Sequence, residues 1–152
     1  MRVFRSVAEI GAAVGEHLGT SDWVEITQER VDTFAEATDD HQWIHVDVDR
    51  ACAESPYGGP IAHGYLSLSL LPALGWQIYS TEGAKMGVNY GSNKVRFPAP
   101  VPVGSRLRLH AVLLEATERP GGAVHMVVEQ TLEIEGLAKP AVVAETISRV
   151  VY

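Results

Sequence analysis

HGYLSLSLLPALGWQIY, residues 63–79, is apolar on nearly every side when it is wound as a helix. A helix that is hydrophobic all round is normally a buried one, so we expect this segment to lie inside the protein. Pro72 falls within it and should kink the helix or mark a local break. The rest of the chain must supply the surface that covers this helix.

The C-terminal half of the chain supplies that surface as a series of strands. Alternating or β-branched residues occupy the ranges 85–97, 105–117, 123–134 and 141–151, and turn residues separate them. Strands that follow one another through short turns form an antiparallel sheet. The sequence therefore predicts an α+β fold with the apolar helix on the concave face of an antiparallel sheet.

The segment between the N-terminus and the apolar helix is predicted to hold shorter elements. A short strand is expected over 23–26, and Thr27 should cap a helix that ends at Asp39 and Asp40. Carboxylates are unfavourable at the C-terminal end of a helix dipole. A residue placed against its local preference is a mild sign of function. Asp47 is expected to cap a further short helix.

Composition limits the class of protein. The chain has 152 residues, 46% hydrophobic and 20% charged, which predicts one globular domain over residues 1–152. Its net charge of −7 argues against nucleic-acid binding. The single cysteine, Cys52, excludes an intramolecular disulfide, and the apolar stretches are too short to span a bilayer. We expect a cytoplasmic protein that does not associate with membranes.

The stretch DDHQWIHVD, residues 39–47, concentrates three carboxylates and two histidines beside an indole. Asp40 and His45 are close enough in sequence to share one water molecule, with the imidazole and the carboxylate exchanging its protons. Trp43 and Ile44 would form an apolar surface there, and burial would push both groups toward their neutral forms. The alternative is that Asp40 ends a turn and His45 is an ordinary loop histidine.

A metal site is a second interpretation of the same stretch. His41 and His45 have the spacing of a pair on one helix face, with Asp40 or Asp47 as a third ligand. Two observations disfavour it: the stretch is predicted to follow a helix end, and no further ligand occurs at a diagnostic spacing. We therefore predict no bound metal.

His63 and Gly64 stand at the start of the apolar helix. The first N–H groups of a helix have no intrahelical acceptor, and a glycine lets a ligand oxygen approach closely. Gly64 is therefore a candidate oxyanion donor for an acyl oxygen, although the pair could equally be a simple turn. Together with Asp40 and His45, it suits addition of water to a carbon beside a polarised acyl group. The chain has no G-x-S-x-G motif for acyl transfer.

Three blocks of sequence resemble one known family. FAEATDDHQWIHVD (34–47), GGPIAHGYLSLSLLP (58–72) and NKVRFPAPVPVGSRL (93–107) are similar, in order and spacing, to the MaoC-like, R-specific enoyl-CoA hydratases. The resemblance extends from about residue 23 to the end of the chain. It implies a hot-dog fold, in which an antiparallel sheet wraps around a long central helix, and a homodimer.

The resemblance also implies residue roles. Asp40 and His45 would bind the catalytic water and move its protons, and the Gly64 amide would hold the thioester oxygen. Ser67 would help to position Asp40, with Gln42 and His63 as further supporting residues. No metal or redox cofactor is implied, because coenzyme A is part of the substrate.

The chain departs from the usual family pattern at two places. Asp39 stands where the family often has glycine, and Gln42-Trp43 stand where it often has asparagine-proline. A bulky indole at position 43 would narrow the pocket for the acyl chain. The departure therefore bears on acyl chain length rather than on the reaction.

The expected function is that of a hydro-lyase of fatty-acid metabolism, hydrating trans-2-enoyl-CoA reversibly to 3R-hydroxyacyl-CoA. One alternative is a dehydratase acting on acyl carrier protein, which would need a basic patch; Lys94, Arg96, Arg106 and Arg108 are candidates for it. Another is a non-catalytic hot-dog subunit that shapes the site of a partner. A thioesterase is disfavoured because the central helix carries no carboxylate.

Overall fold

A computed structural model describes residues 1–152. Its main sheet has six strands, and every pairing in it is antiparallel. The strand order is β2 (His17–Thr20), β6 (Arg106–Arg119), β7 (Ala123–Ile134), β8 (Val142–Val151) and β5 (Met86–Arg96), with β3 (Val24–Glu25) also paired to β6. The long strands β5 to β8 confirm the predicted sheet, because their ends fall within about two residues of the predicted ranges.

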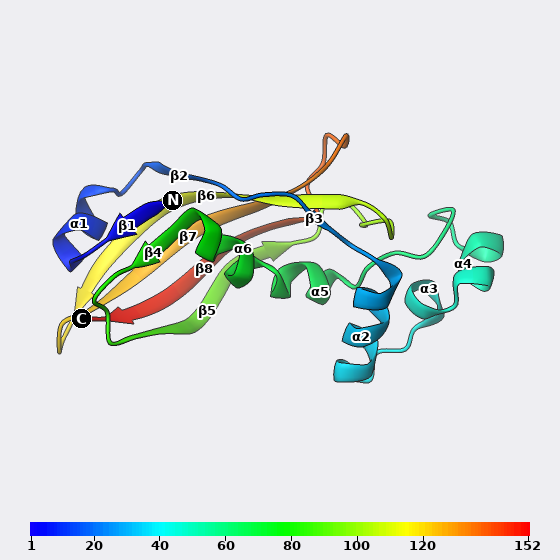
Figure 1. Ribbon diagram of the computed structural model, residues 1–152, viewed down its shortest axis with the longest axis horizontal. Coiled ribbons are helices and arrows are strands. Elements are labelled where there is room, and N and C mark those ends of the chain that lie inside the picture. The colour runs from blue at the N-terminus through cyan, green and yellow to red at the C-terminus, as the bar shows by residue number, and fades with distance from the viewer.

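The apolar segment forms two consecutive helices, α5 (Gly64–Ser69) and α6 (Leu71–Ile78). The break at Leu70 confirms the predicted effect of Pro72, which occupies the first turn of α6, where its missing N–H costs nothing. The two helices lie along the sheet (Figure 1), which is the predicted hot-dog arrangement. None of the helices in the protein has the length and hydrophobicity that a membrane crossing would require.

The prediction that this helix is buried on every side is wrong for the single chain. Leu66, Leu71 and Leu74 are buried in the core. Tyr65 and Trp76, by contrast, are 72% and 73% exposed. The sheet covers one side of the helix and leaves the other side open, although both sides are apolar.

The N-terminus is tied to the end of this helix. Strand β1 (Arg2–Phe4) pairs in parallel with β4 (Tyr79–Thr81), forming a separate two-stranded sheet. Phe4 is completely buried, and its ring packs edge-on against that of Tyr79. Helix α1 (Val7–Ala12) follows and is capped by Ser6. The sequence analysis predicted neither β1 nor β4.

Three small helices, α2 (Gln28–Thr38), α3 (Trp43–Val46) and α4 (Val48–Glu54), lie beyond one end of the sheet, next to α5 (Figure 1). As predicted, the Thr27 side chain caps α2 and the Asp47 side chain caps α4. Helix α2 ends at Asp39, whose φ of 58° is left-handed. This turn sets the direction in which the chain leaves α2 and places the stretch 39–47 opposite the start of α5.

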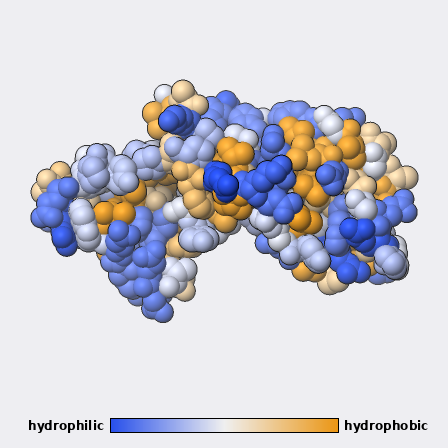
Figure 2. Space-filling view, turned by 180° about the vertical axis from the view of Figure 1, so that it is seen from behind, coloured by the Kyte–Doolittle hydropathy of each residue, from blue (hydrophilic) through white to orange (hydrophobic).

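Apolar side chains also remain uncovered on the sheet. Strand β5 is an edge strand, and Met86, Val88 and Tyr90 on it are exposed. Figure 2 shows hydrophobic residues gathered at the surface of the larger lobe, which contains the sheet, whereas the lobe of α2 to α4 is mostly hydrophilic. The single chain thus leaves apolar surface open along α5, α6 and β5.

Candidate active site

Asp40, His45 and His63 converge between the end of α2, the short helix α3 and the start of α5. One carboxylate oxygen of Asp40 and one ring nitrogen of each histidine lie within 4.8 Å of one another. The predicted pair of Asp40 and His45 is therefore brought together, and His63, predicted as a supporting residue, joins it. A distance of this size leaves room for a water molecule that contacts both groups.

The imidazole of His45 is held in one orientation. The residue is only 7% exposed, and its Nδ1 lies 2.6 Å from the carbonyl oxygen of Ile61. A carbonyl oxygen can only accept, so Nδ1 must donate, and Nε2 is left to exchange protons. The backbone is fixed as well, because the Gln28 side chain donates to the His45 carbonyl at 2.8 Å. His45 is therefore presented as a base with one free nitrogen.

Burial lowers the pKa of His45 below its usual value of 6.5. The hydrogen bond to Ile61 opposes this shift, the nearby ring of His63 adds to it, and Asp40 opposes it weakly. The net direction keeps the imidazole neutral at neutral pH, which is the form that can accept a proton from water.

His63 connects the parts of the site. It is 2% exposed, and its Nε2 donates to the main-chain carbonyl of Asp40 at 2.9 Å. Its ring stacks on that of His45, with centroids 3.8 Å apart, and contacts the ring of Phe34 at 5.0 Å. Its Nδ1 is buried without a partner. His63 thus fixes the backbone of Asp40 against the face of His45.

Asp40 differs from the two histidines because it is exposed. The prediction that burial acts on both members of the pair is therefore wrong for Asp40. Its carboxylate makes no hydrogen bond or ion pair with another residue, although His63 holds its main chain. A carboxylate with no protein partner is free to accept a hydrogen bond from water.

The other predicted residues, Gly64, Ser67 and Gln42, do not contact the pair of Asp40 and His45 in the same way. Gly64 is the first residue of α5, and a Cβ at this position would come within 3.2 Å of the Phe97 ring. Ser67 is buried, but its hydroxyl points to the His63 carbonyl at 3.5 Å and makes no bond to Asp40. Gln42 is exposed and precedes α3 without a capping bond.

The geometry does not join the metal ligands proposed from spacing. His41 is exposed and lies 3.7 Å from Glu36, and Asp47 is used as the cap of α4. The set with ligand spacing is instead Asp40, His45 and His63. Of the three, both histidines already use one ring nitrogen on a backbone carbonyl.

Trp43 packs against Arg50, and its predicted narrowing of the acyl pocket stays a prediction. The guanidinium of Arg50 lies 4.3 Å from the centroid of the Trp43 ring, so the indole faces α4. It does not line the main cavity. The cation–π contact accounts for the orientation, since Arg50 stands near the start of α4 and reaches back over α3.

A large cavity lies between the helices and the sheet. Its volume is about 910 Å³, and it is lined by α5 and α6 on one side and by β5, β7 and β8 on the other. Phe34 and Thr38 of α2 also line it, and Phe34 contacts His63. The cavity therefore approaches the cluster of Asp40, His45 and His63.

Two residues that hold the site were missed in the sequence. Ile61 accepts the His45 hydrogen bond through its backbone, and Gln28 supports His45 from α2. A main-chain acceptor leaves no signal in residue type, because every residue has a carbonyl group. Gln28 was missed because a glutamine in the first turn of a helix is common and does not by itself indicate a role in a site.

The sequence is similar to those of known proteins. Residues 9–135 match the family described as MaoC like domain. The chain is 57% identical over 151 residues to 3-hydroxyacyl-thioester dehydratase Z of Mycobacterium tuberculosis (strain CDC 1551 / Oshkosh), covering 99% of each protein. It is 44% identical over 144 residues to nodulation protein N of Rhizobium leguminosarum bv. viciae, covering 94% of this chain and 89% of that one.

The fold comparison agrees. Unliganded R-hydratase PhaJ1 from Pseudomonas aeruginosa has a TM-score of 0.72 and 24% identity over 94% of this chain and 83% of that chain. At this identity the likeness concerns the fold alone. The family match and the mycobacterial relative both cover most of the sequence, and the sheet and central helix have the same arrangement. The chain therefore belongs to the MaoC-like family of hydratases and dehydratases, with the hot-dog fold.

Proposed function

We propose that the protein hydrates a trans-2-enoyl-CoA reversibly to the 3R-hydroxyacyl-CoA. The observation that carries this proposal is the approach of the Asp40 carboxylate and the His45 imidazole within 4.8 Å, beside a cavity of about 910 Å³. The names of the relatives support it, since one is a 3-hydroxyacyl-thioester dehydratase and another is an R-hydratase. Hydration and dehydration are the two directions of one reaction, and a catalyst accelerates both.

In the proposed mechanism, Asp40 and His45 hold one water molecule between them. The water oxygen bonds to C3 of the enoyl group while the π electrons move toward the thioester oxygen. The N–H of Gly64 donates to that oxygen as negative charge develops on it. C2 then takes up a proton, and the water gives one up to the pair. We do not divide the proton transfers between the two residues, because both would contact the same water.

His63 is proposed as a positioning residue, since it bonds the main chain of Asp40 and stacks on His45. Ser67 and Gln42 make no contact with the pair that would give them such a role, and their support of the site stays a prediction. No metal or redox cofactor enters the proposed reaction.

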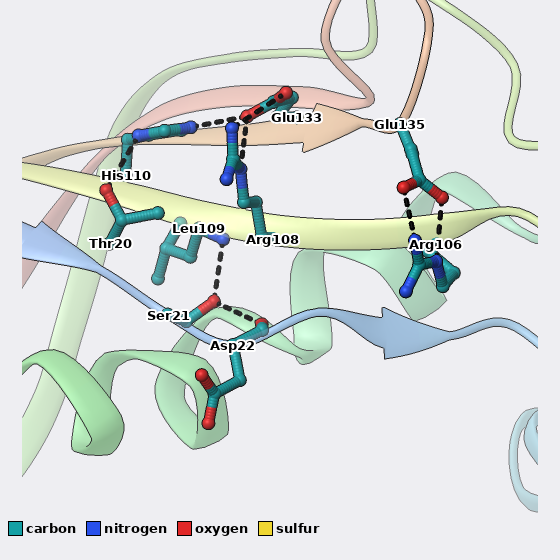
Figure 3. A network of polar contacts seen from close by, with 9 residues as sticks. All are labelled: Thr20, Ser21, Asp22, Arg106, Arg108, Leu109, His110, Glu133 and Glu135. Atoms are coloured by element: carbon teal, nitrogen blue, oxygen red, sulfur yellow. Dashed lines mark hydrogen bonds and ion pairs between the residues drawn. The ribbon is translucent and has the colours of Figure 1, made fainter.

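The structure supports recognition of an acyl carrier protein less well than recognition of coenzyme A. Figure 3 shows Arg106 paired with Glu135 and Arg108 paired with Glu133. Lys94 is paired with Glu145 at 2.6 Å. Arg96 is left without a carboxylate partner. The four cations also lie on β5 and β6, which are separated in the sheet by β7 and β8, so they do not form one basic patch.

Neither a non-catalytic subunit nor a thioesterase has an observation in its favour. A non-catalytic subunit would have no need for a fixed His45 tautomer beside a carboxylate. A thioesterase of this fold would need an acidic residue on the central helix, and α5 and α6 contain none. We also place the enzyme in the cytoplasm, where an exposed, free thiol such as Cys52 stays reduced.

The test is the loss of the conjugated thioester absorbance of crotonyl-CoA. We expect wild-type protein to remove this absorbance, and chiral analysis to show the 3R product. The same rate is expected after dialysis against a chelator. Loss of activity on dialysis, restored by a divalent cation, would assign the cluster of Asp40, His45 and His63 to a metal and contradict the metal-free mechanism.

A homodimer joined through β5 is the proposed assembly. Met86, Val88 and Tyr90 on this edge strand are 52%, 45% and 64% exposed. A long apolar edge strand pairs with another chain or aggregates unless it is protected. A second copy would supply the missing partner and would also cover Trp76.

We expect Val88→Lys to weaken this dimer, because it places a charge in the contact. Light scattering should give about twice the chain mass of 16.5 kDa for wild type and a smaller mass for the variant at low concentration. Val48→Lys is the matched control, since Val48 is 42% exposed on α4, away from the edge. A monomeric wild type would contradict the assembly.

The pH dependence of activity should follow the lowered pKa of His45. Hydration needs the neutral form of the His45 imidazole. This form is lost as the pH falls through the pKa of His45, because the ring becomes protonated. Because the pKa of His45 lies below 6.5 in the folded protein, the acid limb of kcat/KM is expected below pH 6.5. Circular dichroism at each pH separates this limb from unfolding. A limb clearly above 6.5 would contradict the role of neutral His45 in the pair.

A further inference from the structure

One residue interrupts the apolar inner row of β7. Side chains alternate along a strand, and the inward-facing row on β7 consists of buried apolar residues except for Gln130. Gln130 is 4% exposed. Its neighbours across the sheet are Ala111 on β6 and Ala144 on β8, both completely buried. These small apolar side chains offer the carboxamide no hydrogen-bond partner.

The carboxamide of Gln130 is not satisfied within the chain. Its Oε1 is buried and has no hydrogen-bond partner. A buried acceptor without a partner destabilises the fold, and core positions of this kind normally carry an apolar residue. Residues that destabilise a core are retained mainly where they serve function. Gln130 is therefore a candidate functional residue.

The side chain of Gln130 faces the cavity between the helices and the sheet. The sheet side of that cavity also carries Thr146 and Ser148, whereas the helix side presents Leu68 and Leu71. Thr146 does not satisfy Gln130, because its hydroxyl donates to the Val128 carbonyl at 3.4 Å. The helix side of the cavity is therefore mostly apolar, whereas the sheet side mixes polar and apolar side chains.

Gln130 lies along the path of an acyl chain rather than at the reacting carbons. It pairs with Ala144, close to the start of β8, and Figure 1 shows that this end of β8 lies toward α5. The far end of the cavity is lined by Val150, near the C-terminus. A chain that enters beside Asp40 and runs between helix and sheet passes Gln130 on the way.

We propose that Gln130 is a specificity-determining residue that hydrogen-bonds a hydroxyl group carried on the acyl chain of the substrate. This inference rests on the proposed hydration of enoyl thioesters and names the substrate class for it. A hydroxyl both donates and accepts, so it satisfies the carboxamide whichever way the amide is turned. A plain hydrocarbon chain leaves Oε1 unpaired, and a site with an unpaired polar group rejects that chain.

The test compares trans-2-decenoyl-CoA with analogues that carry one hydroxyl, moved carbon by carbon along the distal part of the chain. Wild type should favour one hydroxylated analogue by about tenfold or more in kcat/KM. Gln130→Met should remove this preference, because it lowers kcat/KM for the favoured hydroxylated analogue and relieves the unpaired acceptor that disfavours the plain chain. Leu132→Met is the control, because Leu132 is buried in the same row of β7 but does not line the cavity.

The outcomes separate this inference from the proposed function. If wild type hydrates decenoyl-CoA but shows no preference for any hydroxylated analogue, the role of Gln130 is overturned and the hydratase stands. If wild type hydrates none of them, the hydratase fails, and calorimetric binding of decanoyl-CoA and hydroxydecanoyl-CoA still tests Gln130. Tighter binding of a hydroxylated ligand by wild type alone supports it, whereas equal affinities overturn it.

Stability gives a second measurement. Gln130→Met should unfold at the same temperature as wild type or higher, because it removes an unpaired polar atom from the core. A decrease of several degrees would show that Gln130 serves the fold and would count against the proposed role.

Discussion

Replacing Asp40 by asparagine is expected to lower kcat for crotonyl-CoA about a thousandfold or more, while the protein stays folded. The amide keeps the shape of the carboxylate but cannot take up a proton from water. Asp40 is exposed and its carboxylate has no partner in the chain, so the stability should change by no more than about 0.5 kcal/mol. Turnover is measured from the enoyl absorbance, and stability from thermal unfolding.

The neighbouring Asp39→Asn is the matched control for this experiment. Asp39 is exposed and has a left-handed φ of 58°, a conformation that asparagine also adopts readily. It should keep wild-type turnover. His45→Gln should lose about as much activity as Asp40→Asn, and the double variant little more, because the two groups act as a unit. Near-wild-type turnover of either single variant would refute the assigned pair.

The second large effect is expected from removing the N–H of Gly64. Gly64→Pro deletes this donor but suits the first position of a helix. His63, the preceding residue, already has ψ of 139°, within the range that a following proline requires. If the amide stabilises the thioester oxygen in the transition state, Gly64→Pro should lower kcat by about a hundredfold to a thousandfold.

Gly64→Ala is the control that isolates the donor. A Cβ at this position meets the Phe97 ring at 3.2 Å, and both variants carry that Cβ. Only the alanine variant keeps the N–H, so the ratio of the two kcat values reports the loss of this donor together with the added ring atoms of proline. Equal kcat values for the two variants would remove Gly64 from the mechanism.

The fold was largely predictable because the sequence patterns that indicate its long strands and its central helix are local and repeated. Alternation indicated strand β6 and its inward face, β-branched residues indicated β7, and Pro72 marked the break between α5 and α6. Strands β1 and β4 have three residues each, which is too short for alternation to be recognised. The exposure of Trp76 could not be predicted either. An apolar residue type does not show whether its side chain is buried within the same chain or against another molecule.

The candidate site was predictable where its parts are close in sequence. Asp40 and His45 fall within one short stretch, whereas the bond from His63 to the Asp40 carbonyl spans 23 residues. The orientation of Trp43 toward Arg50, which lies on the next helix, was not predicted. Gln130 left a visible sign, because it interrupts the apolar alternation of Val128 and Leu132.

The strand order has a consequence for how the protein is made. Strand β8, the last element in the chain, lies between β7 and β5, so β5 has no place in the sheet until β8 exists. Helices α5 and α6 and strand β5 therefore leave the ribosome well before the surface they pack against. At about 5–20 residues per second, this interval lasts several seconds. During it, the most apolar part of the nascent chain stays uncovered, so the synthesis of β8 is the step that lets β5 join the sheet.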